Sequence, residues 1–178
     1  SEVEKVEREV DEMVRDSTKE NEDILREVRE RLKKIKEDLD RTVTEVRRLL
    51  KELEEKAREV RDERLKRRLE EELDRILKEV EELAKKLKDD VEEVLKEVKK
   101  LSKRLKDKND KVLKEVEEAG VTKDMLDRVR EKVKRNKEES DKSLDEIRRI
   151  AEEVKRRIDE LLKEIKKRAE ELKRKLRK

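Results

Sequence analysis

The chain has one glycine and no proline in 178 residues, so very few positions oblige a helix or a strand to end. Gly120 is such a position, because glycine readily adopts the left-handed backbone conformation that closes many helices. Thr122 is a good N-cap, since its hydroxyl can accept a hydrogen bond from an amide of the following turn. Val121 precedes this cap and is spaced to pack on Leu126 as a hydrophobic staple. Gly120, Val121 and Thr122 therefore predict a tight turn between two helices.

Apolar residues recur at steps of three and four residues on both sides of this turn, which indicates amphipathic helices. The chain is 62% charged and 30% hydrophobic, a balance that is typical of disorder only where the apolar residues have no such period. In the first segment the repeating positions are Val3, Val6, Val10, Met13, Ile24 or Leu25, Val28, Leu32, Ile35, Leu39, Thr42, Val46, Leu49 or Leu50, Leu53, Ala57 and Val60. The second series begins at Leu65 and includes Leu83 or Ala84, and the third begins at Leu126.

The three-four rhythm breaks after Val60, where residues 61–64 are all charged and the next apolar residue is Leu65. Asp62 can N-cap a new helix, so Arg61 and Asp62 are expected to form a second turn. No glycine marks this turn, and one continuous helix with a skipped position stays open as the alternative. Ser1, with Glu4 three residues later, forms a capping box that predicts the start of the first helix.

The two turns divide the chain into helices at about residues 2–60, 63–119 and 123–178, whose similar lengths favour the second turn. The prediction is an all-α, up-down-up three-helix bundle that forms a single domain about 85 Å long, at 1.5 Å per residue. A mean apolar spacing of about 3.6 residues predicts nearly straight helices with little supercoiling. The apolar stripes are narrow, which favours a monomeric bundle over a component of a larger assembly.

Small uncharged polar residues are rare in this chain, yet they interrupt or flank the apolar stripes of all three predicted helices. With the helices antiparallel and the glycine turn as origin, most of them fall roughly 17 to 30 Å along the bundle. Buried polar groups penalise registers that separate them from their partners, so we expect a hydrogen-bonded layer that specifies register. A polar ligand or ion pocket is the alternative, although ligand pockets are mostly apolar and often aromatic. The predicted layer consists of Ser17, Thr18, Asn21, Ser102, Asn109, Asn136, Ser140 and Ser143.

Thr42 has no polar counterpart at its height along the bundle. A threonine hydroxyl within a helix can bond to a carbonyl of the preceding turn. Thr42 is therefore expected to bond to its own helix.

The amino-acid composition excludes most classes of catalytic site. With no histidine and no cysteine, the usual nucleophile–base pairs and transition-metal sites are missing. The run at residues 107–110 resembles part of a calcium-binding loop, but Lys111 and Val112 stand where that loop needs an oxygen ligand and a glycine. We therefore expect no enzyme, no metal and no cofactor.

The charges also limit the expected partners. The net charge is +3, so opposite charges nearly cancel, and no nucleic-acid partner is predicted. No apolar run approaches the roughly 20 residues of a membrane span and no signal peptide opens the chain, so no membrane partner is predicted and the localisation stays unassigned. Charged neighbours three and four residues apart are interpreted as solvated helix faces with weak stabilising pairs.

The capping box at Ser1 and Glu4, the Gly120-Val121-Thr122 loop, the Glu/Lys/Arg surface and the Leu/Val/Ile core resemble those of de novo designed helical bundles. The polar layer looks like the hydrogen-bond networks that such designs use to fix helix pairing. The resemblance implies a hyperstable, soluble scaffold or a stability and specificity test protein, expressed recombinantly in a cytoplasm and without native activity.

Two other classes of protein stay open. One is a designed interaction module whose helices self-associate, exchange or bind a partner helix. The other is a lipid-binding amphipathic protein, which would need a wider apolar face and interfacial aromatic residues. An enzyme is the least supported class.

Overall fold

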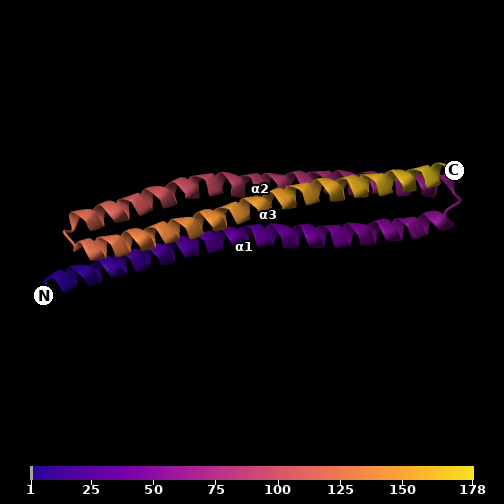
Figure 1. Ribbon diagram of the computed structural model, residues 1–178. Coiled ribbons are helices and arrows are strands. Elements are labelled where there is room, and N and C mark those ends of the chain that lie inside the picture. Colours follow the sequence, from indigo (N-terminus) through magenta and orange to yellow (C-terminus); the bar gives the residue numbers. More distant parts are fainter. Residues whose placement is uncertain (1) are drawn as a thin grey trace. The chain divides into compact units, whose positions relative to one another are not determined.

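The computed structural model describes residues 2–178 and consists of three long helices. They are α1 (Glu2–Glu59), α2 (Glu63–Glu118) and α3 (Lys123–Arg177), as Figure 1 shows. The described residues contain no strand, so the prediction of an all-α three-helix bundle is confirmed. Ser1, the predicted cap of the first helix, lies outside the described residues. Glu2 and Glu4 occupy the first turn of α1, where carboxylates interact favourably with the positive end of the helix dipole.

The chain turns between α1 and α2 without a glycine. Val60, Arg61 and Asp62 are not helical, so the alternative of one continuous helix through this segment is wrong. Asp62 Oδ1 accepts a hydrogen bond from the Arg64 amide at 3.0 Å, and the Asp62 carbonyl accepts one from the Lys66 amide at 3.0 Å. An aspartate N-cap thus satisfies first-turn amides of α2 that have no partner inside the helix.

The turn between α2 and α3 uses the left-handed conformation that only glycine adopts without strain. Gly120 has a φ of 70°, the single positive φ among the described residues. Thr122 Oγ1 accepts a hydrogen bond from the Met125 amide at 3.2 Å, as an N-cap does. Val121 and Leu126 are partly buried against the same apolar cluster, which is where a hydrophobic staple would hold them.

The chain forms two compact units, and each contains parts of all three helices. Unit 1 comprises the described residues up to Arg31 together with Val94–Ile150. Unit 2 comprises Leu32–Glu93 and Ala151–Lys178. That the whole chain behaves as a single domain stays a prediction.

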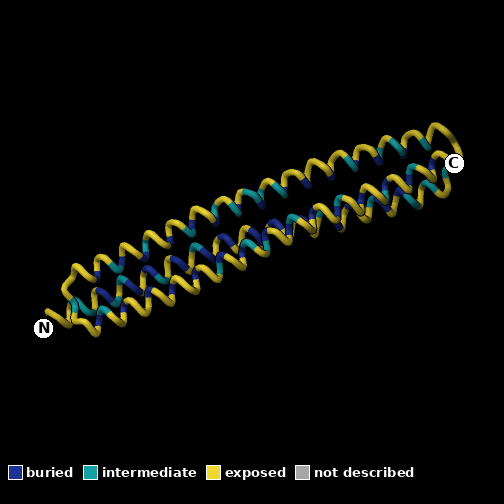
Figure 2. The backbone as a smooth tube through the Cα atoms, turned by 45° about the horizontal axis from the view of Figure 1, so that its top comes forward, coloured by how far each residue is buried: buried dark blue, intermediate teal, exposed yellow. Residues whose placement is uncertain are grey.

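The core of unit 1 consists mainly of valine. In Figure 2 the buried positions recur along one side of each helix, as amphipathic helices require. Valine is shorter than leucine and has a lower helix propensity, so this cluster gains less from burial per position than a leucine core would. One buried cluster of unit 1 contains Val10, Val14, Val112, Val116, Met125, Val129 and Val133. The rest of the unit 1 core also buries Leu25, Leu101, Leu105, Leu144 and Ile147.

The core of unit 2 is richer in leucine and isoleucine. Leucine and isoleucine bury one methylene more than valine does, and each buried methylene stabilises the fold by about 0.8 kcal/mol. The two cores are therefore built from the same helices but differ in apolar content. The buried cluster contains Val46, Leu50, Leu53, Leu69, Leu73, Ile76, Val80, Ile165, Ala169, Leu172 and Leu176.

Several predicted core positions are wrong by one residue. Neighbouring residues in a helix lie about 100° apart, so both can border an apolar stripe, and the rotation of the helix against its neighbours decides which is buried. Val3 and Leu65 were also predicted in the core, but they are 55% and 44% exposed because the first turn of a helix has fewer neighbours. The structure buries Val14 in place of Met13, Val43 in place of Thr42, and Met125 in place of Leu126.

Candidate functional site

All of the buried polar side chains among residues 2–178 belong to the predicted polar layer, and all lie in unit 1. Each helix contributes at least one of them, at a position that continues its apolar stripe. Their burial follows from this spacing, because a residue in the stripe turns inward whatever its polarity. The buried set is Ser17, Asn21, Asn109, Asn136 and Ser140.

Two of these residues carry polar atoms that lack a hydrogen-bond partner among the described residues. They are Ser17 Oγ and both the oxygen and the nitrogen of the Asn21 side-chain amide. A buried polar group in this state costs about 1–3 kcal/mol. No hydrogen bond joins any two of the eight predicted layer residues within residues 2–178. The predicted network between them therefore stays a prediction, whereas the burial of five of them is observed.

The three flanking members of the predicted layer are only partly buried. Thr18 Oγ1 donates to the Val14 carbonyl at 2.9 Å, a local bond within α1. Ser143 Oγ accepts from an Arg29 guanidinium nitrogen at 3.1 Å, which links α3 to α1 in unit 1. Ser102 has no hydrogen bond from its side chain among the described residues.

Two open grooves show which layer residues come close together. Thr18 of α1 and Asn136 of α3 line one groove on unit 1. Ser17 lines another, opposite Lys108 and Val112 of α2. The layer residues therefore face more than one helix interface within unit 1.

Thr42 does not behave as predicted. Its neighbour Thr44 makes such a bond to its own helix, as Thr18 does: Thr44 Oγ1 donates to the Asp40 carbonyl at 2.9 Å. Thr42 instead borders a small apolar cavity of about 30 Å³ in unit 2, together with Ala84 and Leu161. The cavity has the size of a few water molecules but an apolar lining, which does not retain water.

Unit 2 has a set of ion pairs between helices, at positions where the sequence pattern indicates only a solvated surface. Five ion pairs join α2 and α3 among the described residues of unit 2, besides Arg130–Glu117 in unit 1. Successive pairs are four or seven residues apart on each helix, and each step forward along α3 is matched by an equal step backward along α2. This constant register shows that the two helices run antiparallel in unit 2. The pairs are Glu92–Lys155, Lys88–Asp159, Glu81–Lys166, Asp74–Lys173 and Glu70–Arg177.

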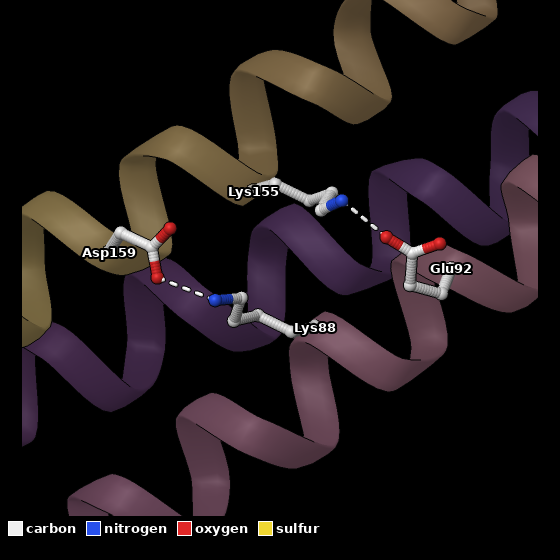
Figure 3. A network of polar contacts seen from close by, with 4 residues as sticks. All are labelled: Lys88, Glu92, Lys155 and Asp159. Atoms are coloured by element: carbon white, nitrogen blue, oxygen red, sulfur yellow. Dashed lines mark hydrogen bonds and ion pairs between the residues drawn. The ribbon is translucent and has the colours of Figure 1, made fainter.

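One of these five pairs has reversed polarity. In four of them α2 supplies the carboxylate, whereas Lys88 of α2 donates to Asp159 Oδ1 of α3 at 2.8 Å. One turn away, Lys155 of α3 donates to Glu92 of α2, as Figure 3 shows. The two neighbouring pairs thus place both signs of charge on each helix.

The reversed pair distinguishes the observed register from registers shifted by one heptad. A shift of seven residues in one direction would place Lys88 opposite Lys166, and a shift in the other direction would place Asp159 opposite Glu81. Like charges in contact are unfavourable by amounts similar to those that exposed opposite charges contribute. Lys155, which pairs with Glu92 in the observed register, would face Lys99 or Lys85 in the two shifted registers and adds to this penalty.

α1 supplies the cation in some of its ion pairs with other helices and the carboxylate in others. In unit 2 its Arg47 pairs with Glu164 at 3.2 Å, and its Glu54 pairs with Arg168 at 2.8 Å. The residue numbers rise together in these two pairs, so α1 and α3 run parallel in this unit. In unit 1 the pairs of α1 are Asp11–Lys132, Glu20–Lys108, Arg29–Glu146 and Arg31–Glu97.

Several of these contacts shift the protonation equilibria of their members. The hydrogen bond from Lys108, and then its charge, lowers the pKa of Glu20. The hydrogen bond from Arg168 lowers the pKa of Glu54, against a smaller effect of burial, and Glu54 raises the pKa of Arg168 in return. The hydrogen bond to Glu92 raises the pKa of Lys155. All four shifts favour the charged forms, as expected of ion pairs in contact.

The described residues hold no group of three or more acidic, histidine or cysteine side chains arranged to bind a metal ion. No helix within residues 2–178 is long and apolar enough to cross a membrane. The polar side chains thus fall into two groups: neutral residues buried in unit 1, and exposed ion pairs between helices in both units.

These features define a class: a three-helix bundle whose helices of 55 to 58 residues are joined by two short turns. No protein-family model matches the chain, and no curated protein matches it. One solved structure to which it is similar is described as a computationally designed three helix bundle. The two chains are 21% identical, with a TM-score of 0.40, and the match covers 98% of this chain and 87% of the other.

Proposed function

We propose that this protein is a designed structural scaffold, or a stability and specificity test protein, without a biochemical activity of its own. The observation that carries the proposal is that polar side chains lie between the helices both in the buried core and at the exposed margins. Unit 1 buries neutral polar residues, and unit 2 carries ion pairs of constant register with one reversed pair. Both features act on helix pairing.

The composition supports the same proposal. Leu, Val and Ile supply most of the core, while Glu, Lys and Arg supply most of the surface, and there is no aromatic residue, proline, histidine or cysteine in 178 residues. Helix caps, core and charged surface agree in specifying long helices, a consistency that is aimed for in design. The two turns use different devices, a glycine at 120 and an aspartate cap at 62.

A first experiment tests whether the protein acts alone. We expect light scattering after size exclusion to give the monomer mass of 21.7 kDa at every protein concentration. Donor-labelled and acceptor-labelled copies, mixed at concentrations of about 5 to 500 µM, should show no energy transfer. Monomers do not associate, so two labels never come together in one particle at any of these concentrations. A mass that rises with concentration, or energy transfer on mixing, would favour a designed interaction module that exchanges helices.

A second experiment tests register specificity. Spin labels at the exposed positions Lys86 of α2 and Glu160 of α3 report the register of these helices. We expect a single distance in the parent protein. In the variant Lys88→Glu with Asp159→Lys all five pairs have one polarity, and a second population should appear with α3 displaced by roughly 10 Å, one heptad of helical rise. A single unchanged distance in that variant would contradict a specifying role for the reversed pair.

A further inference from the structure

Basic residues from two distant segments meet in unit 2. Residues 61–68 carry five Lys or Arg and two Asp or Glu, and residues 173–178 carry five Lys or Arg and no acid. The ion pairs Glu70–Arg177, at 3.4 Å, and Asp74–Lys173 place the last turns of α3 beside the early turns of α2. Figure 1 shows the C-terminus beside the turn that joins α1 to α2.

We call this surface the basic end. Its eight side chains belong to exposed residues, and the last turn of α3 contributes three of them. Only Arg177 makes an ion pair with a described residue. The basic end is formed by Arg61, Arg64, Arg67, Arg68, Arg174, Lys175, Arg177 and Lys178.

Three of the acidic residues next to the basic end are engaged in local contacts. Asp62 caps α2 through the Arg64 amide. Glu63 lies 3.5 Å from the ammonium group of Lys66, and Glu70 pairs with Arg177. The guanidinium groups of the turn and of the first turns of α2 belong to exposed residues. Glu71 and Glu72 lie one turn further along α2 and make no ion pair with them within residues 2–178.

Helix stability does not account for the charges on α2. Cations near a helix N-terminus interact unfavourably with the helix dipole, where carboxylates would be favoured. Arg64, Arg67 and Arg68 lie in the first two turns of α2, three and four residues apart, so they also repel one another. The basic residues at the C-terminus of α3, in contrast, do stabilise their helix.

We propose that the basic end binds the phosphate backbone of double-stranded nucleic acid without sequence preference. Six of its eight residues are arginine, whose planar fork binds phosphate oxygens in a bidentate manner. The chain has no aromatic residue on which unpaired bases could stack, which favours a duplex over a single strand. Leu65 is the one large apolar side chain exposed nearby, too little for insertion into a membrane surface.

This inference revises the sequence-level expectation of no nucleic-acid partner. That expectation used the net charge of +3, which averages over the whole chain. Counterion release depends instead on how many cations reach phosphates at one place. The fold gathers ten basic and two acidic residues from segments that are more than a hundred residues apart in sequence.

The test measures fluorescence anisotropy of a labelled DNA duplex with the full-length protein. For about four phosphate contacts on a duplex of about 20 base pairs, we expect a dissociation constant on the order of 10 µM near 50 mM salt, weakened roughly 100-fold near 200 mM. The variant Arg64→Glu, Arg67→Glu, Arg68→Glu should bind at least about tenfold more weakly. Its fold should persist, because carboxylates suit a helix N-terminus.

A matched variant controls for the change in total charge. Lys78→Glu, Lys85→Glu, Lys86→Glu alters three exposed residues of the same helix, outside the basic end. This variant should keep duplex binding within about threefold of the parent, since it leaves the phosphate contacts in place. Helix content by circular dichroism is measured for both variants.

Three results would overturn the proposal. The first is no detectable binding of the parent protein to the duplex at low salt. The second is an equal loss of binding in both triple variants, which would show that charge acts diffusely. The third is binding to vesicles with anionic headgroups but not to the duplex, which would assign the basic end to a membrane surface.

Discussion

Lys88 of α2 donates a hydrogen bond to Asp159 of α3 at 2.8 Å, with the polarity opposite to that of the four other ion pairs between these helices in unit 2. Changing Lys88→Glu places like charges in contact, and we expect a loss of about 0.5–1 kcal/mol of unfolding free energy. Adding Asp159→Lys should restore most of it. Denaturant titrations of both single variants and the double variant measure the coupling. The same cycle at Glu81 and Lys166 is the control. A coupling energy of zero for Lys88 and Asp159, with a measurable coupling energy for the control pair, would show that the Lys88–Asp159 contact does not form.

Asn21 is completely buried in unit 1, and neither polar atom of its side chain has a partner among the described residues. Leucine has the same branching and no polar atoms, so Asn21→Leu should raise the free energy of unfolding by about 1–2 kcal/mol. Asn136→Leu, at a residue that borders an open groove, should gain less. If Asn21→Leu were clearly destabilising instead, the predicted hydrogen-bond network around Asn21 would be supported.

Backbone amides of unit 1 should exchange with solvent before those of unit 2. The valine core and the unsatisfied polar groups of unit 1 stabilise it less than leucine and isoleucine stabilise unit 2. We expect the protection of Val112 and Val116 to fall below that of Leu69 and Leu73 by about 1–2 kcal/mol of opening free energy. Native-state hydrogen exchange read by mass spectrometry or NMR measures this difference. Equal protection of the two pairs would mean that the units open together.

Stability should be constant across neutral pH and fall at both extremes. Glu20 and Glu54 have lowered pKa values, so their contribution is complete above the ordinary value of 4.5 and is lost as the pH falls through their lower folded-state values. Lys155 has a raised pKa, so its contribution is complete below 10.5 and is lost as the pH rises further. Thermal unfolding followed by circular dichroism measures the profile. Replacing both glutamates by glutamine should flatten the acid limb, and a melting temperature that rises on acidification would contradict this assignment.

Gly120 is needed for its backbone conformation and not for space. A Cβ atom at this position would meet no heavy atom within 4 Å, but the φ of 70° is strained for other residues. Gly120→Ala should therefore cost about 1 kcal/mol of unfolding free energy, and Gly120→Asn less, because asparagine tolerates the left-handed region better. Denaturant unfolding midpoints of the parent, Gly120→Asn and Gly120→Ala measure these differences in stability. An alanine variant as stable as the parent would show that the turn adopts another conformation.

The sequence by itself determined the three helical segments and the turn at Gly120, whereas the turn at Arg61 and Asp62 stayed open against one continuous helix until the structure showed it. A three-four rhythm of apolar residues needs only local geometry. A glycine closes the helix that precedes it, and an aspartate cap accepts hydrogen bonds from amides of the helix that follows. For the same reason the burial of Asn21 or Asn109 was predictable, since a residue in the stripe turns inward whatever its chemistry.

Only the tertiary structure decided which of two neighbouring residues is buried and which charges meet. Val14 was indistinguishable from Met13 in sequence, because the choice depends on how α1 is rotated against α2 and α3. The partner of Lys88 depends on the register of two antiparallel helices, which a shift of one heptad would change without altering the apolar pattern. The basic end likewise needs α3 to finish beside the start of α2, so no property averaged along the chain could reveal it.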